Sequence, residues 1–283
     1  MSGYLESVLV LLAINAILAY AAFLPMVAGQ LNLGVAAFVA IGAYSAGYCS
    51  NSFSVHPVPA ALAGTAVAGA IGWLVAFPIL RTRGIYLALA TFALNQMVQG
   101  TILNLDVVGG ASGYPVPAHI GFAVVAAFSL AVILLVFLAF RTRFGISVTA
   151  VSDDERVADL MGLSVRGLQS AAFTAGAALA GLAGALYAHH FNYIEAQNYG
   201  VLFSIYIVLY VLLGGTQTVY GPLLGAAVFT LLPELLRGSA QWRYVIFAGL
   251  ILALMTWRPQ GVVTRSLLRR LFEWRRPPTV EAT

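Results

Sequence analysis

The 283-residue chain contains no lysine, because all fourteen of its basic residues are arginine. A nucleotide-binding P-loop needs the Gly-Lys-Ser/Thr sequence to hold phosphates, so we expect no Walker-type ATPase and no enzyme activity in this chain. The only cysteine, Cys49, excludes an internal disulfide and is interpreted as a small apolar filler. No cluster of His, Cys and carboxylate suits catalysis, and we expect neither a cofactor nor a nucleic-acid partner.

Charge is also scarce. Only 8% of the residues are charged and 61% are hydrophobic, whereas a soluble globular chain carries roughly 25% charged residues. So little polar surface cannot cover a water-soluble body of this size, which indicates an integral membrane protein. The apolar residues form long blocks and not ten-residue alternating strands, so we predict an all-α, polytopic bundle of membrane helices.

Nine apolar blocks are candidates for membrane spans, with eight to ten as the defensible range because two of them are short. The N-terminal block lacks the basic n-region and small-residue cleavage site of a signal peptide, so it is interpreted as a retained first span. Small residues recur every fourth position in the third and sixth blocks, which predicts close helix crossings. The blocks are 5–28, 33–50, 58–80, 84–105, 119–140, 168–190, 200–214, 220–236 and 243–257.

The arginines predict the orientation, since cytoplasmic loops hold the excess of positive charge. Nine alternating spans place every arginine except Arg237 and Arg243 on one side. The N-terminus is then outside and the C-terminus inside. We predict a transmembrane domain over 1–257, with a cytoplasmic loop at 141–168, and a basic tail over 258–283. The tail sequence "RSLLRRLFEWRR" is typical of an interfacial helix on anionic membrane lipids, with binding of a partner protein as the alternative.

The stretch "AVSDDERVADLMG" (150–162) holds four of the ten acidic residues, within the predicted cytoplasmic loop. Ser152 and Glu155 have the spacing of a capping box, and Gly162 is a typical C-terminal residue, so we predict a helix over 153–161. Ala158, Leu160 and Met161 would form its apolar face. An exposed amphipathic helix of this kind is suited to docking onto a cytoplasmic partner, and a plain solvated loop is the alternative.

Polar residues and glycines interrupt the apolar blocks at two places. Irregular backbone at membrane depth is tolerated only around a cavity, and polar groups there face the interior. We therefore predict that these residues line a translocation path, although tight turns and ordinary interhelical hydrogen bonds would look alike. The adjacent pair His189-His190 does not share a helix face and is not interpreted as a metal site. The path candidates are Gly29, Gln30, Asn32, Gly34, Thr91, Asn95, Gln96, Gly214 and Gly215.

Several separated stretches resemble the permeases of branched-chain amino acid ABC importers, of the LivM type. "AGQLNLGVAAFVAIGAYSAG" (28–47), "LRTRGIYLALATFALNQMV" (80–98) and "LLGGTQTVYGPLLGAAVFTLLPELLR" (212–237) are similar to motifs of that family. The acidic stretch, between "RTRFGISVTA" and "LSVRGLQSAAFTAGAALAGLAGALYA", resembles its cytoplasmic coupling segment. The chain departs from the family pattern at "VGGASGY" (108–114), where Thr-Gly-Gly-x-x-Gly-Leu is typical, and in having fewer basic residues around the acids.

The resemblance implies an importer of leucine, isoleucine and valine in the bacterial inner (plasma) membrane. Its expected partners are a LivH-like sister permease, two ABC ATPase subunits and a periplasmic substrate-binding protein, although the chain could also pair with a second copy of itself. Urea, short amides or sugars are alternative solutes. The residues implied in ATPase coupling are Asp153, Asp154, Glu155, Ala158, Asp159, Met161 and Gly162.

A proton-coupled secondary transporter and a passive channel are rival classes. Proton coupling normally needs an ionisable group inside the bundle. By the predicted segments, Glu6, Asp106, Glu195 and Glu234 lie at segment ends or in loops. A channel would leave the docking segment without a role. Both rivals are therefore disfavoured.

Overall fold

A computed structural model describes residues 3–235 together with 248, 249, 252, 256 and 261. The predicted ninth span and the basic tail lie outside this part apart from those few residues. Ten α-helices make up most of the described chain. They are α1 (Gly3–Val27), α2 (Val35–Ser52), α3 (Pro57–Ile79), α4 (Ile85–Leu103), α5 (Phe122–Arg141), α6 (Arg143–Asp153), α7 (Glu155–Leu160), α8 (Val165–Phe191), α9 (Val201–Gly214) and α10 (Gly221–Leu235).

Four of these helices, α1, α3, α5 and α8, are long and apolar enough to cross a membrane, while α9 and α10 are shorter apolar helices. The prediction of an all-α, polytopic membrane bundle is confirmed. The number of spans and the orientation stay predictions, because nothing in the described residues marks the two faces of the membrane.

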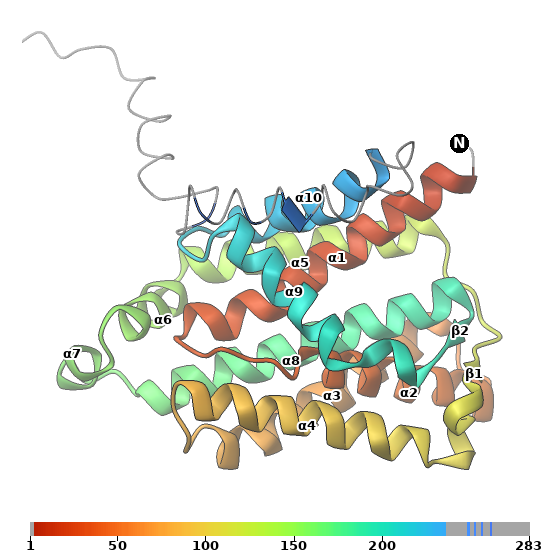
Figure 1. The fold of residues 1–283 in the computed structure, drawn as a ribbon, viewed down its shortest axis with the longest axis horizontal. Coiled ribbons are helices and arrows are strands. Elements are labelled where there is room, and N and C mark those ends of the chain that lie inside the picture. The colour runs from red at the N-terminus through yellow and green to blue at the C-terminus, as the bar shows by residue number, and fades with distance from the viewer. Residues whose placement is uncertain (1–2, 236–247, 250–251, 253–255, 257–260, 262–283) are drawn as a thin grey trace, which may run out of the picture.

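The long helices alternate in direction, and α8 runs through the middle of the bundle (Figure 1). At one end α6 and α7 project beyond the other helices. The N-terminus lies at the opposite end, which also carries a short antiparallel pairing of β1 (Tyr114–Pro115) with β2 (Tyr193–Ile194). The two ends therefore differ, and the coupling segment that the sequence predicts lies at the end away from the N-terminus.

Small residues let α8 approach α2 and α3 closely. A Cβ atom built on Gly42 of α2 would lie under 3.0 Å from the backbone of Gly181, and one on Gly184 would meet the backbone of Val39 in the same way. Gly64 of α3 has the same restriction against the carbonyl oxygen of Gly42. The predicted close crossings are present, since the small-residue stripes of α3 and α8 are buried against neighbouring helices.

The sequence "VGGASGY" builds the end of the molecule beside the strand pair. It contributes parts of two 3₁₀ helices, η1 (Asp106–Val108) and η2 (Gly110–Ser112), and then enters β1. The Tyr193 hydroxyl donates to the carbonyl oxygen of Ser112 at 2.5 Å. A further 3₁₀ helix, η3 (Ala196–Tyr199), follows β2 and packs against α4 before α9 begins.

Candidate coupling and translocation sites

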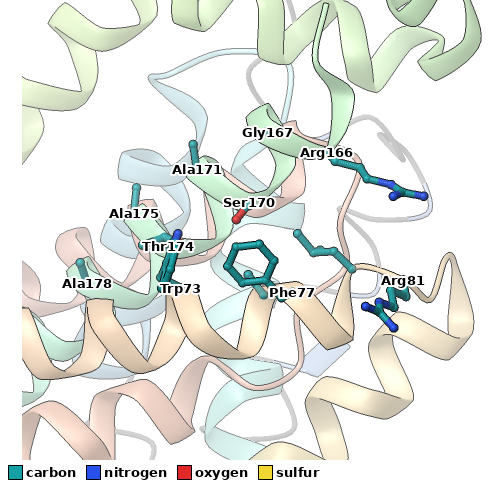
Figure 2. Close-up of a pocket in the computed structure, with 12 residues that line it drawn as sticks. Trp73, Phe77, Arg81, Arg166, Gly167, Ser170, Ala171, Thr174, Ala175 and Ala178 are labelled. Carbon is teal, nitrogen blue, oxygen red and sulfur yellow. The ribbon is translucent and has the colours of Figure 1, made fainter.

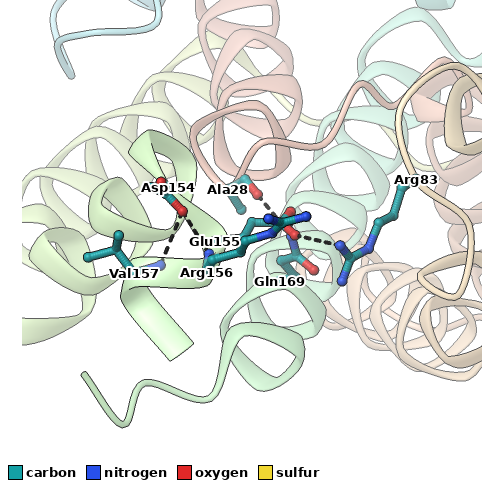
Figure 3. Close-up of polar contacts among 7 residues, drawn as sticks. All are labelled: Ala28, Arg83, Asp154, Glu155, Arg156, Val157 and Gln169. Carbon is teal, nitrogen blue, oxygen red and sulfur yellow. Dashed lines mark hydrogen bonds and ion pairs between the residues drawn. The ribbon is translucent and has the colours of Figure 1, made fainter. Parts of the chain in front are cut away.

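The predicted docking helix exists, but it begins later than the sequence suggested. Its first residue is Glu155, and Asp154 is the N-cap: the carboxylate oxygen Oδ1 of Asp154 accepts hydrogen bonds from the backbone N–H groups of Arg156 at 2.8 Å and Val157 at 3.1 Å (Figure 3). The prediction of Ser152 as the cap was therefore wrong, as was the start of the helix at 153, while its end near 161 was predicted to within one residue. Ser152 lies inside α6, whose last residue is Asp153.

The C-terminus of α7 is formed as predicted. Gly162 has a φ of +80°, in the left-handed region that favours glycine. Its N–H donates to the carbonyl oxygen of Asp159 at 2.9 Å, and the N–H of Leu163 donates to that of Ala158 at 3.1 Å. This pair of bonds is a Schellman motif, which satisfies the last carbonyl groups of a short helix.

The exposed face of α7 differs from the predicted one. Leu160 is 88% exposed and Met161 is 79% exposed, so two large apolar side chains project into solvent at the end of the molecule. Ala158 is only 3% exposed and packs against the chain itself. Of the predicted apolar face, Ala158 is therefore turned inward, and only Leu160 and Met161 are exposed.

Glu155 also points toward its own chain. Its Oε2 lies 3.3 Å from Nη1 of Arg83, in the connection between α3 and α4. Its Oε1 accepts a hydrogen bond from Nε2 of Gln169 in α8 at 2.9 Å, and the same Nε2 lies 3.4 Å from the carbonyl oxygen of Ala28 (Figure 3). One carboxylate thus connects α7 to the α3–α4 connection and to α8, and Gln169 in turn contacts the residue after α1. Sequence reasoning missed Arg83 and Gln169, whose distance along the chain gave no signal of this contact.

Two adjoining cavities open beside α6, with volumes of about 470 Å³ and 230 Å³. Thr149 and Asp153 of α6 and Val27 of α1 line both of them, as do Thr216 and Gln217 of the connection between α9 and α10. Asp153 is therefore at the rim of an internal space as well as in the coupling segment. The second predicted helix break and the coupling segment meet at these cavities.

Two glycines produce the second break. Gly215 ends α9 with a φ of +105°, and a Cβ on Gly214 would lie under 3.0 Å from the backbone of Gly221 at the start of α10. Gly261 packs against the backbone of Gly215 and Gly214. Gly214 and Gly215 thus make a tight turn, which was one of the two alternatives for this sequence, and the residues after them line the cavities.

The first break, between α1 and α2, packs against α4. Gly29 has a φ of +77° and starts the turn. The Oδ1 of Asn32 accepts the N–H of Gly34 at 2.8 Å, and the Oγ1 of Thr91 accepts the N–H of Leu33 at 3.0 Å. Asn32 therefore holds the irregular backbone in place by a local hydrogen bond, and Thr91 does so by an interhelical one. This is the alternative to a path-lining role for these two residues.

Gln30 is the exception within this break. Its side chain is 2% exposed, yet neither Nε2 nor Oε1 has a hydrogen-bond partner among the described residues. A buried polar group without a partner costs about 1–3 kcal/mol, so it calls for an explanation such as water, an ion or a ligand. Of the predicted path residues, Gln30 thus has the most unused hydrogen-bonding capacity for a solute.

One face of α4 is polar. Thr91, Asn95 and Gln99 are four residues apart, so they lie on the same side of the helix. Asn95 Nδ2 donates to the carbonyl oxygen of Tyr199 at 3.3 Å, and Gln99 Nε2 donates to that of Ala196 at 3.1 Å.

Gln96 is exposed and lies off this face, so it does not face the interior as predicted, whereas Gln99 shares the face of Asn95. The four-residue spacing from Asn95 was the available signal.

Three further polar atoms are buried without partners near this face. They are Oδ1 of Asn95 and the hydroxyl groups of Tyr44 and Tyr199, whose rings are 6.4 Å apart. Tyr199 also lines a mainly apolar cavity of about 190 Å³ between α1, α2, α8 and α9, with room for roughly six water molecules. Tyr44 and Tyr199 were not singled out from the sequence, because tyrosine is common in apolar helices.

The two adjacent histidines are held separately within the chain. The Nε2 of His189 lies 2.7 Å from the hydroxyl of Ser50, and its Nδ1 lies 2.8 Å from the carbonyl oxygen of Ala185. His190 Nδ1 lies 2.8 Å from the carbonyl oxygen of Ile120. Each histidine therefore has local hydrogen-bond partners, and the two do not share a ligand-binding geometry.

Comparison with known proteins gives a consistent picture. Residues 4–256 match the family described as "Branched-chain amino acid transport system / permease component". The LivM permease protein of the high-affinity branched-chain amino acid transport system of Escherichia coli (strain K12) is 28% identical over 279 residues, covering 85% of this chain and 66% of the relative. The chain thus spans somewhat under two thirds of the length of that relative.

More distant relatives differ in the solute that their names give. The probable branched-chain amino acid permease LivH of Methanocaldococcus jannaschii is 25% identical, over 79% of this chain and 75% of the relative. An autoinducer 2 import permease, LsrC of Yersinia pestis, is 34% identical over 44% of this chain and 37% of the relative. No solved structure matches the chain.

Proposed function

Because the chain belongs to the family of branched-chain amino acid transport system permease components, we propose that it is a transmembrane permease subunit of an ABC importer. The solutes are leucine, isoleucine and valine, which enter the cytoplasm across the bacterial inner membrane. Separate ATPase subunits hydrolyse the ATP. The observation that carries this proposal is the family match over most of the chain. It is joined by the exposed helix α7, whose Glu155 binds Gln169, which contacts Ala28 before the first break, and whose neighbour α6 lines the cavities beside the second break.

The partners follow from this assignment. Two ABC ATPase subunits bind at the end that carries α7, where the arginine distribution predicts the cytoplasm. A sister permease completes the membrane part, and a substrate-binding protein delivers the solute at the opposite end, beside the β1–β2 pair. Membrane lipids surround the exposed apolar side chains of α3, α4 and α5.

Solute passage follows the polar face of α4. The buried amide of Gln30, the Oδ1 of Asn95 and the hydroxyl groups of Tyr44 and Tyr199 have unused hydrogen-bonding capacity. An amino-acid solute carries an ammonium and a carboxylate group, and both need polar partners when they leave water. The mainly apolar cavity beside Tyr199 suits an aliphatic side chain. These features support a path between α1, α2, α4 and η3.

Coupling starts at Leu160 and Met161, which dock into the ATPase surface. The acidic residues Asp153 and Asp159 face outward and meet basic groups there. Displacement of α7 is transmitted through Glu155 to Arg83 and Gln169, and from Gln169 toward the end of α1. Displacement of α6 changes the cavities beside the second break.

The test is reconstitution of the complete importer in proteoliposomes, with measurement of ATP-driven uptake of radiolabelled leucine, isoleucine and valine. Uptake should require all subunits and be inhibited by vanadate. Uptake that persists without the ATPase would indicate a secondary transporter or channel. Uptake of urea, acetamide or a sugar in place of the amino acids would leave the permease assignment intact and overturn the solute.

The docking step is tested separately by Leu160→Asp and Met161→Asp. Both side chains are exposed, so the substitutions should leave the fold intact while reducing solute-stimulated ATP hydrolysis and uptake at least tenfold. Leu160→Met and Met161→Leu are the matched controls, because they keep an apolar side chain of similar size at the same exposed positions. Losses in these two variants as large as those in the aspartate variants would contradict apolar docking by α7.

A further inference from the structure

A groove of about 810 Å³ runs between α3 and α8 on the outside of the bundle. Its walls are mainly apolar: Trp73 and Phe77 come from α3, and alanines come from α8 together with Thr174 (Figure 2). Leu80, the residue after α3, also lines it. The rings of Trp73 and Phe77 are 5.0 Å apart in an edge-to-face arrangement and form one side. Both side chains are more than half exposed, so nothing in the described chain covers the groove.

The groove has the dimensions of one lipid chain. Along α8 it extends from Ala178 to Arg166, and twelve residues of α-helix correspond to roughly 18 Å. Half of a hydrocarbon core about 30 Å thick is about 15 Å. The groove therefore runs from the membrane surface to about the middle of the bilayer, the distance that an acyl chain of one leaflet covers.

Two arginines close the groove at its surface end. Arg81 follows the last turn of α3, and Arg166 is in the first turn of α8; both side chains extend at the same end of the groove (Figure 2). Within residues 3–235 neither guanidinium is paired with a carboxylate. Ser170, one turn deeper along α8, places a hydroxyl just below them.

We propose that this groove binds an anionic phospholipid. The two guanidinium groups hold the headgroup phosphate, because planar guanidinium groups match phosphate oxygens well. Ser170 lies at the level of the ester carbonyls, and one acyl chain lies against Trp73 and Phe77. Basic pockets between membrane helices at the cytoplasmic surface are typical headgroup sites. The inference depends on α3 and α8 spanning the membrane and is independent of the transported solute.

Charge favours a lipid over a helix of the sister permease. A protein segment seated here would have to bring carboxylates to Arg81 and Arg166 at the membrane surface, whereas an anionic lipid supplies the negative charge and the apolar chain in one molecule. The apolar walls lie on the membrane side of the arginines, as the lipid geometry requires.

The experiment is native mass spectrometry of the assembled complex, released from nanodiscs of equal parts phosphatidylglycerol and phosphatidylcholine. We expect a retained phosphatidylglycerol that is lost in the double variant Arg81→Gln/Arg166→Gln, with affinity reduced roughly 30-fold. Arg141→Gln/Arg143→Gln is the control with the same loss of charge at exposed positions outside the groove. Ala171→Phe, which fills the groove and keeps both arginines, should also reduce retention.

Four results would overturn the proposal. The double variant could retain phosphatidylglycerol like the original protein, or the control variant could lose it equally, which would indicate unspecific surface charge. Displacement by millimolar inorganic phosphate alone, with no effect of Ala171→Phe, would indicate an anion site without a lipid chain. A cysteine at position 171, in a Cys49→Ala background, could form a disulfide with a cysteine placed in the sister permease, which would make the groove a protein interface.

Discussion

The crossing of α2, α3 and α8 and the coupling segment α6–α7 are held together in opposite ways. At the crossing, backbone meets backbone: a single methyl group on Gly42 would collide with Gly181. At the coupling segment, the contacts to the bundle include one ion pair whose side chains are 79% and 35% exposed, for Arg83 and Glu155 respectively, and a hydrogen bond to Gln169.

From this difference we expect the crossing of α2, α3 and α8 to be rigid and the segment α6–α7 to be movable. Forcing extra volume into a tightly packed interior costs about 1–3 kcal/mol, whereas an exposed ion pair contributes about 0–1 kcal/mol. A force applied at α7 would therefore change the weak polar contacts long before it separates the helices of the crossing. We therefore expect α7, in which only Ala158 is buried, to shift more readily than the helices of the crossing.

The largest expected effect is at the crossing. Gly42→Ala should lower the free energy of unfolding by roughly 1–3 kcal/mol, because the added methyl group has no space against α8. The measurement is the apparent melting temperature of the purified permease in detergent. Gly100→Ala is the control: a Cβ there meets nothing within 4 Å, so alanine should be neutral or stabilise α4 by up to about 1 kcal/mol. Similar behaviour of the two variants would show that the crossing is not rigid.

Apolar substitutions at the two polar residues of the first break, Gln30 and Asn32, should change the free energy of unfolding in opposite directions. Gln30→Met removes a buried amide without partners and should stabilise the protein by about 1 kcal/mol while reducing uptake. Asn32→Leu removes the acceptor of the Gly34 N–H and should destabilise it by about 1–3 kcal/mol. Thermal stability and uptake are measured on the same preparations. Normal uptake by Gln30→Met would remove Gln30 from the path.

The contact between α7 and the bundle should affect coupling more than stability. Glu155→Gln should change the free energy of unfolding by no more than about 1 kcal/mol, since the pair with Arg83 is exposed. We expect the number of ATP molecules hydrolysed per solute to rise severalfold, because α7 then moves without α3–α4. The charge-exchanged variant Glu155→Arg/Arg83→Glu should restore part of the coupling. A ratio that stays unchanged in Glu155→Gln would contradict transmission through this pair.

The sequence predicted the elements and missed the contacts between them. Apolar block lengths located α1 to α5 and α8 to α10 to within a few residues, because a span needs a fixed number of apolar residues, whereas α6 was not predicted. The helix stop at Gly162 was also predictable, since glycine takes the left-handed conformation at little cost. Arg83 and Gln169 lie far from Glu155 along the chain, and only the packing of α3, α7 and α8 brings them together.

Errors in the candidate site have two local causes. The path assignment of Gln96 treated neighbouring residues as equivalent, although consecutive positions of a helix point about 100° apart, and Gln99 shares the face of Asn95. The docking face was misjudged at Ala158 because helix periodicity identifies an apolar face and does not tell whether the chain itself covers it. Both errors concern the direction in which a side chain points relative to the rest of the bundle. That direction depends on how each helix packs against its neighbours.

The smallest expected effect concerns the cap of α7. Asp154→Ala should destabilise this helix by about 1 kcal/mol, since two backbone N–H groups lose their acceptor, and Asp154→Asn should retain most of the cap. Hydrogen exchange at the amides of Arg156 and Val157 measures this opening, while the global melting temperature should stay unchanged. Ser152→Ala is the matched control, because Ser152 lies within α6 and caps nothing in α7. Faster exchange in Ser152→Ala than in Asp154→Ala would support the capping box that the sequence suggested, with Ser152 as the cap. The coupling helix would then extend toward α6 as one longer and stiffer element.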